Sequence, residues 1–539
     1  MRLLICRNKD GTTRSYLHLL RSRRVNGKTR QELVCSLGRL DLMRVDGSLD
    51  RLIEGLTHYS EKQWVMMEAL KGGWQKIYGP VLVFRRLWEQ LGLDGLLTGL
   101  QAKTAVQFSL DEAVFAMVLH RLLEPGSKRA TYQWLETVYR PQFETLELQH
   151  LYRALDRLLS GKEMIEESLF NRNCNLFAMN VDLVLFDTTL VHFEGSGPED
   201  LATMARPGDY PDCVKVLVGL ILTRDGFPIA HHVFPGSTAD INAFKAAIKD
   251  LKQRFSLRRV IIVADRGCVS HDLIEGLENK TPGETQIDYI LGMRLRKNKE
   301  VQKEVLRRAG RYHEVSDSLE LKEIWVGEHR YVVCHNPEEE IRDRLEREKI
   351  IEHTRRELDT KGPKAFIMPK GVRRYVELKG GELKLKERAI REDARYDGKW
   401  VLRTNTELGA EEVALAYKSL WQIEHAFREL KSGLEINPVF LRTEDHVRGH
   451  IIVCFLALVL EATLIRRLRK GVTAGSSPEQ GSEADISYRE ILKDLDKVRA
   501  EEIKVNKKRW LVRSELAGQA MLAFRAVGTR LPPLVRSLA

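Results

Sequence analysis

Cysteine is scarce in this 539-residue chain, and its seven copies are scattered. They form no C-x-x-C pair and no cluster with histidine. These absences argue against a zinc site and against a disulfide framework, and they suit a reducing, cytoplasmic setting. The first residues also hold no apolar stretch of the signal-peptide kind.

Long hydrophobic runs are missing as well. The most apolar segment, HIIVCFLALVLEATLI (450–465), is short for a membrane span and contains Glu461. We therefore expect a buried core helix here, and no membrane partner. Apolar residues make up 43% of the chain and charged residues 30%, which is a globular composition.

Positive charge is in excess and unevenly placed. The 87 basic and 76 acidic residues leave a formal charge of +11, which favours a polyanionic partner such as nucleic acid. Residues 1–44 carry eleven Lys or Arg against three Asp or Glu, densest in LLRSRRVNGKTRQ (19–31). Two interpretations of this basic segment are equally supported by its charge. It is either a solvated hairpin that turns at VNGK, or a basic arm that binds a phosphate backbone.

Changes of pattern along the chain predict an α/β fold in several parts. The expected parts are a small basic β-rich unit (1–48), a helical, DNA-binding region (49–178), the first part of a mixed-sheet core (179–296), a β-rich and charged insertion (297–396), the second part of the core (397–471), a linker (472–487) and a C-terminal helical region for dimerisation or DNA contact (488–539).

The segment YKSLWQIEHAFRELKS (417–432) has the pattern of one helix. At about 100° per residue, Glu424 falls at the edge of the apolar face, near Arg428 and Lys431. Glu429 falls on the other side and is expected to be solvated. A Glu424–Arg428 ion pair without further function is the ordinary alternative, because such i, i+4 pairs are common on helices.

Two aspartates occupy unusual places in strands. Asp187 lies inside the apolar strand LVLFDTTLV, and Asp265 ends the strand VIIVADRG. Strand interiors disfavour aspartate, and a buried carboxylate is costly unless it is paired or binds a metal. With Glu424 from a helix, the two would form an acidic pocket for Mg²⁺, or Mn²⁺ in its place. Two such ions suit an in-line phosphoryl displacement.

The sequence resembles a known family, the bacterial insertion-sequence DDE transposases with the signature Tyr-x2-Arg-x3-Glu-x6-Lys. Tyr417, Glu424 and Lys431 match this signature in spacing, and Leu420 stands at the arginine position. FDTTLV, GLILTRDGFPIAHHVFPGSTAD, VIIVADRG, HRLLEPGSKRATYQWL and DGKWVLRTN are similar to further blocks of this group. The resemblance covers about residues 75 to 465.

The resemblance implies a ribonuclease-H-like core with Asp187, Asp265 and Glu424 as catalytic metal ligands, interrupted by a β-rich insertion. It implies metal-dependent cleavage at transposon ends, followed by attack of the freed 3′ hydroxyl on target DNA. The implied partners are double-stranded DNA, as terminal inverted repeats and as target, and a second copy of the chain in a synaptic homodimer. The implied location is the bacterial cytoplasm, at the nucleoid.

The resemblance also implies DNA contacts. Tyr417 and Lys431 would hold the end phosphate, and Arg428 would supply the charge that Leu420 lacks. Trp325, in the insertion, would stack on a base, although a core tryptophan in a strand is an equal alternative. Lys128, within HRLLEPGSKRATYQWL, is a further candidate for DNA contact.

Two other functions remain open at this stage. One is a DNA-binding protein of transposase ancestry that has lost cleavage, which the missing arginine would suit. The other is a ribonuclease-H-like nuclease of repair or defence. The complete set of three carboxylates argues against the first, and the signature helix with its long insertion argues against the second.

Overall fold

The structure is a computed structural model of the 539-residue chain. It describes residues 2–9, 11–25, 28–57, 59, 74–173, 182–204, 213–255, 259–278, 286–361, 373–379, 382–473, 487–505 and 508–538. The chain divides into two compact units. The first comprises Met1–Gly73, Glu501–Val512 and Val535–Ala539, and the second comprises Trp74–Ala500 and Arg513–Leu534.

The first unit contains a three-stranded antiparallel sheet in the order β1-β2-β3. Its elements are β1 (Arg2–Arg7), β2 (Thr13–Val25), β3 (Lys28–Arg39), α1 (Leu40–Val45) and α2 (Ser48–Thr57). Val25 pairs with Lys28, so the chain reverses at the VNGK segment as its turn residues predict. Leu3, Leu4 and Ile5 on β1 are exposed.

The second unit begins with a layer of helices. Its elements are β4 (Lys76–Ile77), α3 (Gly79–Gln90), α4 (Leu93–Ala102), α5 (Leu110–Leu123), α6 (Lys128–Trp134), η2 (Leu135–Thr137), η3 (Pro141–Thr145), α7 (Leu148–Ser160) and α8 (Lys162–Asn173). Serine caps fix two of the starts, because Ser109 accepts from the Glu112 N–H and Ser127 from the Ala130 N–H.

A mixed ten-stranded sheet follows, in the order β11-β12-β13-β16-β10-β9-β5-β7-β6, with β8 paired to β7. The strands are β5 (Asp182–His192), β6 (Thr203–Met204), β7 (Val214–Thr223), β8 (Pro228–Pro235), β9 (Arg259–Ala264), β10 (Gln286–Gly292), β11 (His313–Ser316), β12 (Leu319–Val326), β13 (His329–His335) and β16 (Lys399–Thr404). β9 runs parallel to both β5 and β10, and the other pairings are antiparallel.

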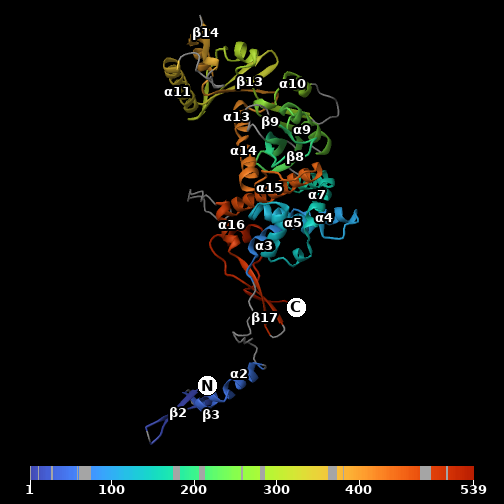
Figure 1. Ribbon diagram of the computed structural model, residues 1–539. Coiled ribbons are helices and arrows are strands. Elements are labelled where there is room, and N and C mark those ends of the chain that lie inside the picture. Colours follow the sequence, from blue (N-terminus) through green and yellow to red (C-terminus); the bar gives the residue numbers. More distant parts are fainter. Residues whose placement is uncertain are drawn as a thin grey trace. The chain divides into compact units, whose positions relative to one another are not determined.

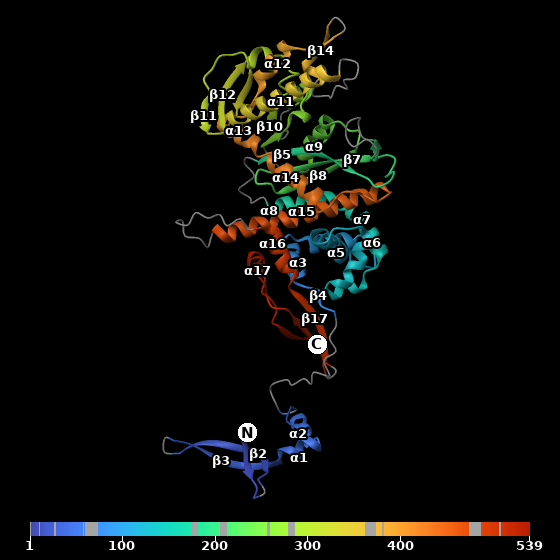
Figure 2. The ribbon, with the colours of Figure 1, turned by 60° about the vertical axis from the view of Figure 1, so that its left-hand side comes forward.

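Side chains along β5 alternate between two cores, as the two-residue period of a strand requires. Leu183 and Leu185 belong to the core shared with the helical layer, whereas Val184 and Phe186 face the helix α9 (Asp240–Arg254). Figure 2 shows α9 on one side of β5 and β8, and α14 on the other. An odd-numbered residue such as Asp187 therefore lies on the side of α14.

The helix α15 (Glu444–Thr473) joins the sheet to the helical layer. It packs against β8 on one side and against α5 and α7 on the other, as Figure 1 shows. Its residues from Ile451 to Leu460 are all buried, which confirms the expectation of a core helix. Within the described residues, no helix has both the length and the apolar character needed to cross a membrane.

The remaining elements lie after β9, mostly in the expected insertion and beyond it. They are η5 (Arg266–Cys268), α10 (His271–Glu278), η6 (Val301–Val305), α11 (Pro337–Lys361), η7 (Arg373–Tyr375), β14 (Val376–Lys379), β15 (Glu382–Leu385), α12 (Glu387–Asp393), η8 (Ala394–Tyr396), α13 (Ala410–Lys418), α14 (Trp421–Arg428), η9 (Glu429–Gly433), α16 (Tyr488–Asp496), β17 (Arg499–Val505), β18 (Lys508–Arg513), α17 (Ala520–Ala526) and β19 (Val535–Leu538). Most of the predicted linker lies outside the described residues.

The insertion strands extend the core sheet. β13 pairs with β16 along its whole length, and β16 pairs on its other side with β10. The hairpin of β12 and β13 turns at Gly327, whose φ of 60° lies in the region that favours glycine. The insertion is thereby joined through β16 to β10, the strand next to β9.

An acid is buried where α15 meets η9 and α16. The side chain of Glu461 is buried, and so is the hydroxyl of Tyr488. The expectation that Glu429 is solvated is wrong: its side chain is 17% exposed, and its Oε1 lies 3.8 Å from Nη2 of Arg489. Burial, with a smaller contribution from the charge of Glu429, raises the pKa of the Glu461 carboxyl to about 8, and Arg489 opposes the rise.

We expect the Glu461→Gln variant to be more stable than the wild type above neutral pH. The carboxyl has a higher pKa in the folded state than its ordinary 4.5, so the folded state binds the proton more tightly than the unfolded state does. The stability that this proton adds is fully present below about pH 4.5 and is lost as the pH rises through about 8. The difference in unfolding free energy between the variant and the wild type should increase by roughly 2–4 kcal/mol from pH 5 to pH 8, since one pKa unit corresponds to about 1.4 kcal/mol.

Thermal or denaturant unfolding at the two pH values measures this difference. Glu490→Gln, at an exposed position on α16, is the control and should show no such growth. A gain for Glu461→Gln that is equal at both pH values would mean that Glu461 is already ionised in the folded protein.

Candidate active site

Strand register brings Asp187 and Asp265 side by side. β5 and β9 are parallel neighbours, and their paired positions end with Phe186 opposite Ala264. The next residue on each chain is an aspartate. Both fall on the face covered by α14, because they follow residues whose side chains face α9.

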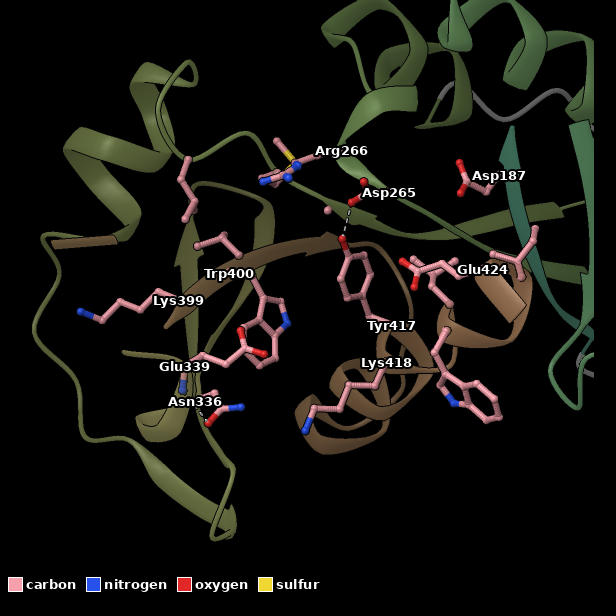
Figure 3. A pocket seen from close by; sticks show the side chains of 17 residues that line it. Asp187, Asp265, Arg266, Asn336, Glu339, Lys399, Trp400, Tyr417, Lys418 and Glu424 are labelled. Atoms are coloured by element: carbon pink, nitrogen blue, oxygen red, sulfur yellow. Dashed lines mark hydrogen bonds between the residues drawn. The ribbon is translucent and has the colours of Figure 1, made fainter. Parts of the chain in front are cut away.

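Glu424 reaches the same place from a helix. The expected single helix over 417–432 is in fact interrupted: α13 ends at Lys418, and α14 begins at Trp421. α14 packs against β5 through its buried face, and Glu424 lies on the exposed side of that helix. Figure 3 shows Glu424 near Asp187 and Asp265, with Tyr417 from α13 beside them.

Leu420 lies at the break between the two helices and is 9% exposed. It packs in the main core with Ile423, Phe427 and Leu430. Leu420 also lines the smaller of the two cavities described below, together with Glu424. The family signature has an arginine at this position, so the departure replaces a charge in that wall with an apolar side chain.

Tyr417 is tied to the second aspartate. Its hydroxyl donates to Oδ1 of Asp265 at 2.7 Å. Burial and the Asp265 charge raise the pKa of Tyr417, so the phenol stays a donor at neutral pH. A Cβ on Gly292 would lie 2.4 Å from the Tyr417 oxygen, so only glycine leaves room for this tyrosine at the end of β10.

The electrostatics of the cluster raise the pKa of Asp187 to about 6. Burial is the largest cause, and the charges of Asp265, Asp240 and Glu424 add to it. One hydrogen bond opposes the rise, because the N–H of Thr188 donates to Oδ1 of Asp187 at 2.8 Å. Burial and the neighbouring carboxylates together disfavour ionisation of Asp187, as is common in functional sites.

Asp240 is a further carboxylate at this place, and it was not among the candidates predicted from the sequence. It is the first residue of α9, and its Oδ1 accepts a hydrogen bond from Oγ1 of Thr188 at 2.8 Å. It shares a cavity wall with Asp187 and Asp265. The sequence did hold one indication of this role. Asp240 follows shortly after β8, and β8 pairs with β7, which in turn pairs with β5.

Two cavities meet at the aspartates. One, of about 550 Å³, has Glu424 and Tyr417 in its wall; the other, of about 730 Å³, has Asp240 and Lys431; Asp187 and Asp265 line both. The carboxylate oxygens of Asp187, Asp265 and Glu424 do not all lie within 4.8 Å of one another. The acids are thus spread around the junction, and the cavities give it access from two sides.

The cavities also hold basic and aromatic side chains. Lys431 lies in the larger cavity with Lys215, and burial together with the Lys215 charge lowers the pKa of Lys431, which Asp187 opposes. The smaller cavity contains Trp400 and Trp421. Trp421 is 55% exposed, whereas the indole N–H of Trp400 is buried with no acceptor among the described residues.

Three other candidates lie apart from the acids. Arg428 is exposed on α14 and lines neither cavity. Trp325 on β12 is 50% exposed, so it is not a core tryptophan, and its indole N–H donates to Oε1 of Glu323 at 2.8 Å. Lys128 is 4% exposed, and its Nζ lies 3.4 Å from Nδ1 of His450.

A mixed sheet with aspartates on parallel neighbouring strands, and a glutamate on a helix across one face, is the arrangement of a ribonuclease-H-like core. The chain belongs to the transposase DDE-domain family, whose model matches residues 182–460, more than half of its length. A second family model, the N-terminal domain of IS1634 family transposases, matches residues 5–68. Both matches confirm the predicted resemblance to bacterial insertion-sequence DDE transposases.

Among solved structures, the chain is similar to the piggyBac transposase in a synaptic complex with hairpin DNA, determined by cryo-electron microscopy. The identity is 9%, the TM-score is 0.38, and the match covers 79% of this chain and 82% of that one. No curated protein sequence matches the chain.

We expect Gly292→Ala to impair the site more than Tyr417→Phe does. The added Cβ would displace the whole tyrosine ring from β10, whereas phenylalanine removes only the hydrogen bond to Asp265, a loss of about 1–3 kcal/mol in unfolding free energy. Thermal unfolding of the two variants measures the loss of stability in each. Equal effects of the two variants would contradict the close approach.

Proposed function

We propose that this protein cleaves DNA at the ends of its insertion sequence and joins the freed 3′ ends to target DNA. The observation that carries the proposal is the register of β5 and β9, which sets Asp187 beside Asp265, with Glu424 opposite them on α14. Transposases of this family act on DNA, and this site has the chemistry that such an activity needs.

The donor set fits a divalent metal. Asp187, Asp265 and Glu424 line one cavity, together with Glu339, and in the described part of the chain none of the first three forms an ion pair with a basic side chain. Oxygen donors of this kind suit Mg²⁺ or Mn²⁺. We assign Asp187, Asp265 and Glu424 as the ligands of two such ions, which would stabilise charge on the attacking and leaving oxygens.

The reaction has two displacements at phosphorus. In the first, the oxygen of water bonds to a phosphorus at the transposon end, and the 3′ oxygen leaves as a hydroxyl. In the second, that hydroxyl attacks a phosphorus of target DNA and displaces the 3′ oxygen there. Tyr417 holds Asp265 in place during both, through its 2.7 Å hydrogen bond.

The neighbouring side chains are suited to the DNA. Lys431 and Lys215 line the larger cavity next to Asp187 and place positive charge where a phosphodiester would lie. In the smaller cavity, the exposed ring of Trp421 offers a surface on which a base would stack. The solvent-facing Trp325 is assigned to base stacking.

The DNA partners in this proposal are the terminal inverted repeats and the target duplex. Arg428 is assigned to a backbone contact outside the cavities, since its side chain is exposed. Two copies of the chain would hold the two transposon ends together, in the bacterial cytoplasm at the nucleoid.

Substitution of the acids tests the chemistry. Asp187→Ala and Glu424→Gln should each lower cleavage of transposon-end DNA in Mg²⁺ by at least about a hundredfold, while end binding survives, because each variant removes a carboxylate from the metal ligands. Glu429→Gln is the matched control on the same stretch of helix and should retain cleavage. Gel assays of cleavage and of binding, on the element's own ends, give both numbers.

Each contrary result points to a different function. If the wild type binds the ends but does not cut them in Mg²⁺ or Mn²⁺, the protein is a DNA-binding relative that has lost cleavage. Cutting of any duplex without preference for the ends would indicate a nuclease. Equal losses in Glu424→Gln and Glu429→Gln would refute the assignment of Glu424.

Lys431→Met should weaken end binding and make it less dependent on salt. Each phosphate contact contributes about 0.9 to the slope of log K against log salt, so the slope should fall by about one. Lys245→Met, an exposed site on α9, is the control and should leave the slope unchanged. Binding titrations at several salt concentrations provide the slopes. If Lys431→Met has the same salt slope as the wild type, Lys431 does not contact a DNA phosphate.

A further inference from the structure

A small cavity lies beside the turn between α5 and α6. Its volume is about 120 Å³, and its wall includes Arg121, Lys128 and His450, from α5, α6 and α15. The loop that follows η9 closes another side with Glu435 and Asn437. The proposed cleavage reaction uses none of these polar side chains.

Two basic side chains are buried here without an acid. Lys128 is 4% exposed and Arg121 is 5% exposed. The Arg121 guanidinium donates only to backbone carbonyls, those of Leu434 at 3.1 Å, Glu435 at 3.0 Å and Gly126 at 2.7 Å. Lys128 has its 3.4 Å contact with the imidazole of His450. Across the described ranges, no carboxylate forms an ion pair with either cation.

Such an arrangement is costly in an empty site. Burial and the nearby Arg121 charge lower the pKa of Lys128 to about 7, and the pKa of His450 is held well below its usual 6.5. Buried charges in proteins are normally paired or bound to an ion of opposite sign. An anion in the cavity would offset the desolvation of both cations and favour the charged form of Lys128.

Glu435 does not fill this role from within the chain. Its side chain is exposed, and its φ of 44° lies in the left-handed region that residues other than glycine rarely adopt. In this conformation its carbonyl oxygen accepts from Arg121, while its carboxylate forms no ion pair within the described residues. An anion that pairs with Lys128 and Arg121 would therefore have to be a bound ligand.

We propose that this cavity binds a phosphate group, with Lys128 as its buried counter-charge. The volume of about 120 Å³ holds one small oxyanion but is well below the several hundred cubic ångströms of sites for larger ligands. Two sources share this chemistry, a backbone phosphate of bound DNA and free inorganic phosphate. The DNA source rests on the proposed function, and we infer it from the position of the cavity.

That position ties the cavity to the acids. Asn437 lines both this cavity and the larger one that contains Asp187 and Lys431. The Oδ1 of Asn437 accepts from the N–H of His192 at 3.0 Å, at the end of the strand that carries Asp187. A duplex held at Lys431 would therefore have further phosphates close to this second site.

Thermal unfolding of the full-length protein in phosphate, against chloride at equal ionic strength, tests the site. Phosphate should raise the Tm of the wild type, as any ligand of the folded state does. Lys128→Met should lose most of this shift. Arg129→Met, the exposed next residue on α6, is the matched control and should keep it. Equal shifts in all three proteins would overturn the proposal.

A second variant keeps the test decisive if Lys128→Met does not fold. Glu435 is exposed, and among the described residues it supplies the one carboxylate in the wall of the cavity, which Glu435→Gln removes. This variant should tighten phosphate binding about two- to fivefold, measured by calorimetry, because a nearby like charge is lost. Unchanged or weaker binding would also overturn the proposal.

Salt-dependent binding of transposon-end DNA distinguishes a DNA backbone phosphate from free phosphate. For a backbone phosphate, Lys128→Met should lower the salt slope of end binding by about one, while Arg129→Met leaves it unchanged. A phosphate-dependent Tm with a wild-type slope in Lys128→Met would overturn the DNA source and identify free phosphate as the ligand. Asp187→Ala should keep the phosphate shift, so failure of the cleavage assignment is seen separately.

Discussion

The parallel pairing of β5 with β9 is the constraint on which the site depends. A shift of one residue would move Asp187 out of line with Asp265 and exchange the side chains that face the two cores. The register is held from both sides of the sheet, by Leu183 and Leu185 toward the helical layer and by Phe186 toward α9. Packing of apolar side chains thus decides where the two carboxylates meet.

The same packing brings distant segments of the chain to the acids. α15, buried between β8 and α5, follows the loop that begins at Leu434. That loop accepts hydrogen bonds from Arg121 of α5 and pairs through Val439 with the backbone at His192. The helix of the glutamate, the strand of the first aspartate and the helical layer are therefore fixed to one another by backbone contacts rather than by the acids themselves.

The sequence was informative where one segment decides the outcome. Asp187 within an apolar strand and Asp265 at a strand end were visible from pattern alone, but the pairing register was not, because it depends on residues far apart in the chain. A helical wheel misplaced Glu429, since α16, which covers it, lies some sixty residues later. Asp240 was missed because an aspartate that begins a helix has an ordinary explanation as a cap.

The place of α14 late in the chain has a consequence for synthesis on the ribosome. The strands that carry Asp187 and Asp265 emerge first, and β10 to β16 must follow before Glu424 is made. α15, which covers the sheet behind that glutamate, comes later still. A nascent chain therefore holds an incomplete set of acids until most of the core has been translated, so truncated products that end within the insertion lack the third carboxylate altogether.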